Sequence, residues 1–177
     1  MKATVIAIVG SKSSGKTTAI EILTKELTKR GYKIATVKHI PEPNFTIDKE
    51  GKDTWRFAKS GAKTIISVAS NEIATIEKST EASFSLRTIL KKCKSSDIIF
   101  LEGFRKLIGK KMTVQKIVVV KSEKEALEAL KSFKPILAFT GPYSTENMNL
   151  KIPYIDILKN SEKLGDMIER FLGRNDL

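Results

Sequence analysis

The sequence contains few residues that crosslink a chain or bind metals through sulfur. Its 177 residues include one cysteine, Cys93, and one histidine, His39. A single cysteine excludes a disulfide within the chain and any metal site built from cysteines alone. We interpret Cys93 as a structural thiol near the end of a helix.

Long hydrophobic runs are also missing. No stretch of about 18 apolar residues occurs, so we expect no transmembrane helix. The apolar run at residues 4–9 is short, and it leads into a glycine motif rather than into the cleavage site of a signal peptide. We therefore interpret it as a buried strand of a soluble, cytoplasmic protein.

Acidic and aromatic residues are scarce relative to basic ones. The chain has 32 Lys and Arg against 20 Asp and Glu, a net charge of +12, and 7% aromatic residues. Such a charge favours polyanions such as nucleic acid, anionic lipid or a phosphorylated small molecule. The lysines, however, mostly alternate with glutamates at helical spacing, as in residues 123–131, which is typical of a solvated face. With few aromatic rings to stack on bases, nucleic acid is not the partner we expect.

The hydrophobic pattern predicts the fold class. Short apolar runs alternate with longer amphipathic ones, which favours an α/β fold with a mostly parallel sheet and helices on both faces. The expected strands of that sheet are residues 4–9, 33–38, 97–101, 116–120, 136–140 and 152–157. The expected helices are residues 17–30, 54–60, 81–94, 123–131 and 161–172.

An insertion is predicted between the second and third of these strands. Residues 40–53 form a long loop, a kind of segment that is often functional. Residues 64–70 and 73–77 are two further strands, and their close connection at Asn71-Glu72 predicts a β-hairpin. Because neither a repeat nor a low-complexity linker occurs, we expect a single nucleotide-binding domain over residues 1–177.

The most specific motif is Gly10-Ser-Lys-Ser-Ser-Gly-Lys-Thr17, which matches the phosphate-loop (P-loop) pattern between a strand and a helix. Its glycines let backbone N–H groups approach phosphate oxygens, and the helix that follows adds the positive end of its dipole. Lys16 reaches the β- and γ-phosphates, and the Thr17 hydroxyl can ligate Mg²⁺. The pattern predicts a P-loop NTPase fold. The residues expected to hold the nucleotide are Gly10, Ser13, Ser14, Gly15, Lys16, Thr17, Thr18 and His39.

Two acidic residues are candidates for the metal shell. Glu102 follows an apolar strand and precedes a glycine, so it should emerge where the carboxyl ends of parallel strands form a binding crevice. Asp48 lies in the long loop, where a contact to Mg²⁺ or water competes with a helix-capping or solvent-facing role. We therefore predict Thr17, Asp48 and Glu102 as metal contacts and Lys16, Asp48 and Glu102 as catalytic residues. His39 ends the second strand beside the P-loop, where structural and functional roles are equally supported.

Taken in order, these motifs resemble the molybdopterin-guanine dinucleotide biosynthesis protein B (MobB) family over about the first 120 residues. The resemblance rests on Ser13-Ser-Gly-Lys-Thr-Thr18, Val37-Lys-His39, Ile47-Asp48, Gly51-Lys-Asp53 with Arg56, Gly61-Ala62, Ser67-Val-Ala-Ser70, and Leu101-Glu-Gly-Phe104 followed by a basic residue. The chain departs from the family at Ile40-Pro-Glu-Pro-Asn-Phe45, where family members often carry further histidines and an aspartate.

The resemblance implies a protein that binds GTP with Mg²⁺, hydrolyses it slowly and assists the attachment of GMP to molybdopterin. The implied partners are GTP, molybdopterin or its molybdenum form, a guanylyltransferase and a second copy of the chain. The basic stretch 105–111 is a candidate contact for the phosphate of molybdopterin, with a solvated loop as the equal alternative. Because no Asn-Lys-x-Asp sequence occurs, Thr140-Gly-Pro-Tyr143 is our candidate for the base pocket.

Two other functions are compatible with the same phosphate loop. A small-molecule kinase would use the same loop, but it would need an arginine-rich lid, and the arginines of this chain do not cluster. A non-catalytic adapter, whose surface changes with the bound nucleotide, fits as well, because no residue stands out as a base that would activate water.

Overall fold

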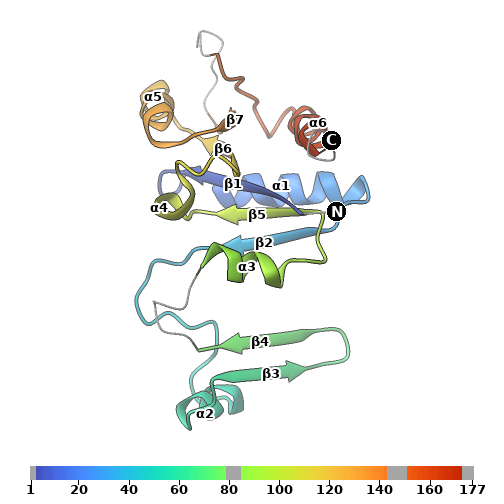
Figure 1. Ribbon diagram of the computed structural model, residues 1–177, viewed down its shortest axis with the longest axis vertical. Coiled ribbons are helices and arrows are strands. Elements are labelled where there is room, and N and C mark those ends of the chain that lie inside the picture. The colour runs from blue at the N-terminus through green and yellow to red at the C-terminus, as the bar shows by residue number, and fades with distance from the viewer. Residues whose placement is uncertain (1–2, 79–84, 143–150, 173–177) are drawn as a thin grey trace. The chain divides into compact units, whose positions relative to one another are not determined.

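The fold is given by a computed structural model, which describes residues 3–78, 85–142 and 151–172 (Figure 1). The chain forms two compact units. Unit one comprises Met1–His39 and Leu90–Leu177, and unit two comprises Ile40–Ile89. Unit two is thus inserted into the chain of unit one, and the organisation as a single domain stays a prediction.

Unit one contains a five-stranded sheet in which every pair of neighbouring strands is parallel. The strands are β1 (Thr4–Gly10), β2 (Ile34–Lys38), β5 (Ile98–Glu102), β6 (Gln115–Val119) and β7 (Ile136–Thr140). Their order is β2-β5-β1-β6-β7, so β5 lies between β2 and β1. All five agree with the predicted strands to within a residue or two at each end, and the predicted fold class is confirmed.

The helices of unit one either connect these strands or, in the case of the last one, follow β7. They are α1 (Lys16–Lys29), α4 (Arg105–Ile108), α5 (Glu123–Ser132) and α6 (Ser161–Leu172), while α3 (Leu86–Lys92) crosses the boundary with unit two. Two expectations differ from the structure. The stretch 105–111 begins with the short helix α4 rather than forming only a loop, and residues 152–157 contribute one isolated bridge, between Tyr154 and Phe139, rather than a strand. Of the predicted helix 81–94, residues 81–84 lie outside the described ranges.

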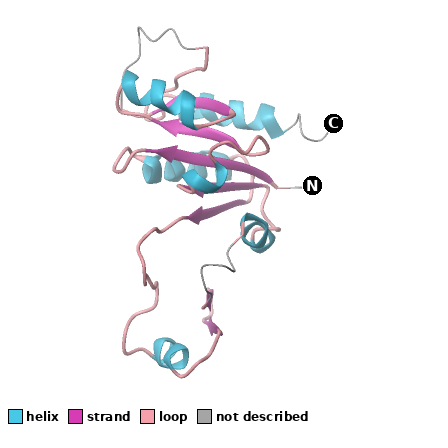
Figure 2. Ribbon diagram, turned by 60° about the vertical axis from the view of Figure 1, so that its left-hand side comes forward, coloured by secondary structure: helices cyan, strands magenta, loops and turns pink. Residues whose placement is uncertain are grey.

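Both faces of the sheet are buried. Alternate strand residues such as Ile6, Ile8 and Phe100 belong to one core cluster with Leu23 of α1 and Leu164 of α6. The intervening residues Ala7, Val9, Ile99 and Leu101 are also at most 1% exposed. Because successive side chains of a strand point to opposite faces, helices must cover both sides. Figure 2 shows helices on both sides of the strands, as the sequence predicted.

A charged cluster joins α1 to α6. The guanidinium of Arg30 lies 2.8 Å from Asp166 and 2.6 Å from Glu169, and it also pairs with Glu26 one turn earlier in α1. Gly165 leaves room for it, because a Cβ at that position would lie 2.9 Å from Arg30 Nη2. These contacts fix the C-terminal end of α1, whereas the phosphate loop precedes its N-terminal end.

Lys116 is an unusual core residue, because its side chain is fully buried in β6. Its ammonium donates to the carbonyl oxygens of Lys111 and Lys134, each at 2.6 Å. It thereby ties the segment after α4 to a residue two positions before β7. Burial lowers its pKa from 10.5 to about 8, because removal from water disfavours the charged form.

This buried lysine predicts a specific dependence of stability on pH. Between pH 8 and 10.5 the unfolded chain keeps a proton on Lys116 that the folded chain releases, so the free energy of unfolding rises with pH across this window. We expect the free energy of unfolding of wild type, measured with denaturant and taken relative to that of Lys116→Met, to rise by up to about 3 kcal/mol from pH 8 to pH 10.5. A pH-independent difference between the two proteins would contradict the assignment.

Unit two contains α2 (Asp53–Lys59) and an antiparallel pair, β3 (Thr64–Val68) and β4 (Ile73–Glu77). The predicted hairpin is confirmed. Ile65 of β3 is 5% exposed, whereas Ile66, Val68 and Ile73 are 60%, 75% and 69% exposed. In the strand register Val68 lies opposite Ile73, so these three side chains share one exposed apolar face of the hairpin.

No helix within the described ranges is both long enough and apolar enough to span a bilayer.

Candidate functional site

The loop between β1 and α1 is held tightly against β6. Gly10 ends β1, and a Cβ at that position would lie 2.4 Å from the carbonyl oxygen of Val119 and 2.7 Å from Ser14 Oγ. Gly15, which precedes α1, has φ 95° and is in the left-handed region, where glycine is strongly favoured. The two glycines of the motif are therefore required by space at Gly10 and by backbone conformation at Gly15.

Two hydroxyl groups in this loop have no partner among the described residues. Ser14 is 2% exposed, and its Oγ and that of Ser11 are buried without a hydrogen bond to any described residue. Buried polar groups are normally paired, since an unpaired one costs about 1–3 kcal/mol. A bound anion with acceptor oxygens, such as a phosphate group, would satisfy both hydroxyls.

Lys16 is the first residue of α1, and its Nζ donates to the carbonyl oxygen of Ser11 at 2.6 Å. Burial is the main cause that lowers its pKa; Glu102 opposes the shift, and the positive charges of Arg105, Lys38 and Lys121 add to it. Several cations therefore gather around this loop. An anion bound there would offset both their mutual repulsion and the loss of water from Lys16.

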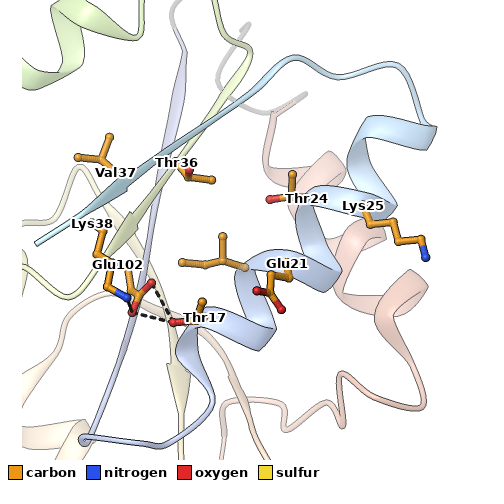
Figure 3. Close-up of a pocket in the computed structure, with 9 residues that line it drawn as sticks. Thr17, Glu21, Thr24, Lys25, Thr36, Val37, Lys38 and Glu102 are labelled. Atoms are coloured by element: carbon orange, nitrogen blue, oxygen red, sulfur yellow. Dashed lines mark hydrogen bonds and ion pairs between the residues drawn. The ribbon is translucent and has the colours of Figure 1, made fainter. Parts of the chain in front are cut away.

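Glu102, at the end of β5, connects this loop to β2 (Figure 3). Thr17 Oγ1 lies 3.1 Å from Glu102 Oε1 and 3.2 Å from Oε2, so its hydroxyl donates to the carboxylate. Lys38 Nζ lies 3.4 Å from Glu102 Oε1. The Glu102 side chain is 13% exposed and is thus held between a hydroxyl and an ammonium group.

Thr17 and Glu102 fit a Mg²⁺ ion that is shared with phosphate. Mg²⁺ prefers oxygen ligands, keeps several waters and usually takes only one or two protein groups beside substrate phosphates. The Thr17 hydroxyl can offer a lone pair to a metal while its hydrogen stays with Glu102. Among the described residues no three His, Cys, Asp or Glu side chains form a metal-binding group, so a cage made only of protein ligands is not built there.

His39 lies at the same edge of the sheet as Glu102. Its backbone N–H donates to the Glu102 carbonyl oxygen at 3.0 Å, and its ring centroid lies 5.1 Å from that of Phe104. A Cβ on Gly103 would lie 3.5 Å from the His39 Cβ. The structure thus places His39 next to Glu102 and the two residues that follow it. A contact from the His39 imidazole to nucleotide stays a prediction.

Asp48 belongs to unit two, where its described contacts are local. Its Oδ1 accepts hydrogen bonds from the Lys49 backbone at 3.0 Å and from Thr54 Oγ1 at 2.7 Å. Thr54 lies in the first turn of α2, but its bond to Asp48 comes from the side-chain hydroxyl and not from a backbone N–H of the helix, so these two contacts do not make Asp48 a helix cap. Its Oδ2 is buried without a partner among the described residues. A metal contact by Asp48 stays a prediction.

The candidate base pocket is only partly described. Thr140 ends β7 and is fully buried, and its hydroxyl has no partner in the described part of the chain. The Gly141 carbonyl accepts a hydrogen bond from the Tyr154 hydroxyl. Tyr143, the last residue of this candidate, lies outside the described ranges.

Sequence reasoning assigned no role to Lys38, although it pairs with Glu102. The signal for it was topological, because the register of β2 and β5 places Lys38 directly opposite Glu102. Together they border a groove of about 540 Å³ between α1 and β2 (Figure 3). The groove is lined by Thr17, Ile20, Glu21, Thr24, Lys25, Thr36, Val37, Lys38 and Glu102.

Comparison with known proteins identifies the family that this chain resembles. A family model described as molybdopterin guanine dinucleotide synthesis protein B (MobB) matches residues 5–141. A crystal structure of molybdopterin-guanine biosynthesis protein B superimposes with a TM-score of 0.71 at 27% identity, covering 95% of this chain and 98% of that one.

Two curated relatives share a third of their aligned residues with the chain. One from Methanocaldococcus jannaschii is 34% identical over 122 residues, which is 67% of this chain and 48% of the relative. The molybdopterin-guanine dinucleotide biosynthesis adapter protein of Haemophilus influenzae is 34% identical over 102 residues, 56% of each protein. The chain therefore aligns with only about half the length of these two relatives.

Proposed function

This chain belongs to the MobB family, and from that premise we propose that it is a GTP-binding accessory protein of molybdopterin guanine dinucleotide synthesis with weak, Mg²⁺-dependent GTPase activity. The adapter role is that of the curated relative from Haemophilus influenzae. GTP as the nucleotide and molybdopterin as the downstream substrate are inferences from the family. The pairing of Thr17 with Glu102 next to Lys16 is the single observation that carries the nucleotide part of the proposal.

In the proposed mechanism the protein binds and orients the nucleotide rather than reacting with it. The loop at Gly10–Thr17 holds the phosphates through backbone N–H groups, Lys16 and the hydroxyls of Ser11 and Ser14. A Mg²⁺ ion at Thr17 and Glu102 would neutralise charge on the β- and γ-phosphates. Turnover is slow in this proposal because both Thr17 and Lys38 engage the Glu102 carboxylate, so that its oxygens are occupied and not positioned to take a proton from water.

Side-by-side measurements with GTP and ATP test the proposal. Binding is followed by calorimetry and phosphate release by a continuous assay, each with and without Mg²⁺. Tight GTP binding with slow phosphate release supports it. Preference for ATP would overturn GTP as the nucleotide, and phosphate transfer to an added small molecule would overturn the proposal in favour of a kinase. GTP binding without any release would leave the non-catalytic adapter as the function.

The metal role of Glu102 gives a separate prediction. In Glu102→Gln the Mg²⁺ concentration that half-saturates GTP binding should rise about 10- to 100-fold, because the amide lacks the charge that orients the Thr17 hydroxyl and any metal-bound water. A Mg²⁺ titration of GTP affinity measures this. Glu21→Gln is the matched control, since Glu21 lines the same groove but is exposed. An unchanged Mg²⁺ requirement in Glu102→Gln would remove Glu102 from the metal shell.

We further propose that the chain acts as a homodimer and works with a guanylyltransferase. The exposed apolar face formed by Ile66, Val68 and Ile73 supports self-association, because an isolated two-stranded sheet is only marginally stable in water. Light scattering should give twice the 19.7 kDa of one chain. A monomer would refute the dimer, and a failed pull-down of the guanylyltransferase would refute the pathway but not the nucleotide site.

A further inference from the structure

The connection from β5 to α4 has an unusual backbone. Gly103 has φ 85° and Phe104 has φ 55°, so two successive residues are left-handed before α4 begins at Arg105. A bulky residue in this region is rare and persists only where its surroundings hold it. Phe104 is 4% exposed, and its carbonyl accepts the N–H groups of Leu107 and Ile108 at 2.9 and 3.0 Å. The start of α4 is therefore fixed with respect to Glu102.

Arg105 is placed by an aromatic ring rather than by a carboxylate. Its guanidinium carbon lies 5.2 Å from the centroid of the Phe133 ring, a distance at which a cation is attracted to the ring face. No acidic side chain in the described part of the chain pairs with it. By contrast, Arg30 contacts three carboxylates. The guanidinium donors of Arg105 are thus held in place but lack an anionic partner.

Among the cations that act on Lys16, Arg105 is the one for which the described residues supply no counter-charge. Lys38 pairs with Glu102 at 3.4 Å, and Lys121 lies 3.9 Å from Glu125. Arg105 lies close enough to Lys16 for its charge to lower the pKa of that ammonium. A triphosphate held at Lys16 would bring the missing negative charge to Arg105.

We propose that Arg105 contacts the γ-phosphate of the bound triphosphate and so makes the site distinguish triphosphates from diphosphates; this inference rests on the proposed nucleotide function. The planar guanidinium presents paired N–H donors that match two oxygens of one phosphate group. This proposal gives the first residue of the basic stretch 105–111 a nucleotide phosphate as its partner, while a contact of that stretch with the phosphate of molybdopterin stays a prediction.

The same contact stabilises the transferred group during hydrolysis. The oxygen of water bonds to the γ-phosphorus while the bond from that phosphorus to the β–γ bridging oxygen breaks. The bridging oxygen keeps the electron pair and leaves as the nucleoside diphosphate. One proton of the water stays on inorganic phosphate and the other passes to solvent. Arg105 donates hydrogen bonds to the γ-phosphoryl oxygens, where negative charge is concentrated throughout.

Equilibrium binding of GTP and of GDP, each with Mg²⁺, to Arg105→Ala and Arg105→Lys tests the proposal. Arg105→Ala should weaken GTP binding about 10- to 100-fold and GDP binding less than about threefold, because only GTP carries the γ-phosphate. Turnover should fall in parallel. Arg105→Lys should restore part of the GTP affinity through its charge. Arg170→Ala, an exposed arginine on α6 in the same unit, should match wild type.

Each result separates this inference from the proposed function. Equal losses for GTP and GDP, or no loss for either, would overturn the assignment of Arg105 while leaving a GTP-binding protein intact. If wild type prefers ATP, the base assignment fails, and the ATP and ADP affinities of Arg105→Ala test the γ-phosphate contact in the same way. If wild type binds no nucleotide, the proposed function and this inference fall together.

Discussion

Replacing Lys16 with alanine should lower the affinity for nucleoside triphosphate at least about 100-fold. Lys16 is the cation that starts α1, and its ammonium would exchange the Ser11 carbonyl, now 2.6 Å away, for phosphate oxygens. Each hydrogen bond between charged groups contributes about 1.5–3 kcal/mol, and Lys16 is placed to make more than one. Calorimetry or displacement of a fluorescent nucleotide would measure the loss.

The fold should survive this substitution. Burial lowers the pKa of Lys16, which means that the folded protein holds this charge at a cost and gains little stability from it. The melting temperature without nucleotide should therefore stay within a few degrees of wild type. Lys12→Ala is the matched control, because Lys12 is an exposed lysine in the same loop. Equal losses of affinity in the two variants would mean that the loop attracts phosphate only by its general charge.

Gly10→Ala should have the largest effect on stability, lowering the free energy of unfolding by about 3 kcal/mol and weakening nucleotide binding with it. The new methyl group would lie 2.4 Å from the Val119 carbonyl oxygen. That oxygen belongs to the backbone of β6, which the neighbouring strands hold on both sides. The loop must therefore shift, and with it the backbone N–H groups that face phosphate. Urea unfolding and nucleotide affinity measure the two effects.

Gly31→Ala separates this steric effect from backbone strain. Gly31 follows α1 with φ 93°, and nothing lies within 4 Å of a Cβ there. Its substitution should cost about 1 kcal/mol, the penalty of a left-handed alanine. If Gly10→Ala cost no more than Gly31→Ala, the contact with β6 would not be what restricts the loop.

The sheet and the phosphate loop could be predicted from sequence because their signals are local. Residues 98–102 are four apolar residues followed by Glu102, and β5 is indeed buried up to that residue. In residues 152–157 the apolar pattern correctly indicated burial, since Ile155 and Ile157 are 3% and 4% exposed. The pattern did not reveal that only Tyr154 pairs with β7, because burial and strand pairing leave the same apolar signature.

Other parts of the site depend on contacts between distant residues. The helix α4 has only four residues and is preceded by a left-handed phenylalanine, a conformation that no propensity indicates. The pairing of Lys38 with Glu102 joins residues 64 positions apart and follows from strand order, which sequence patterns do not give. For Asp48, the sequence indicated a choice between a metal contact and a local cap, and its described contacts are with neighbours along the chain.

The position of β5 between β1 and β2 has a consequence for how the chain folds during synthesis. The first two strands of the sheet do not pair with each other, so neither gains a hydrogen-bonded neighbour until residues 98–102 have been made. All of unit two is synthesised in the interval. Pairing β1 with β5 then closes a long loop, and parallel sheets that depend on such distant contacts form slowly. The apolar strand that leads into the phosphate loop is thus exposed early, which makes the N-terminal half of the nascent chain the part most in need of protection from aggregation.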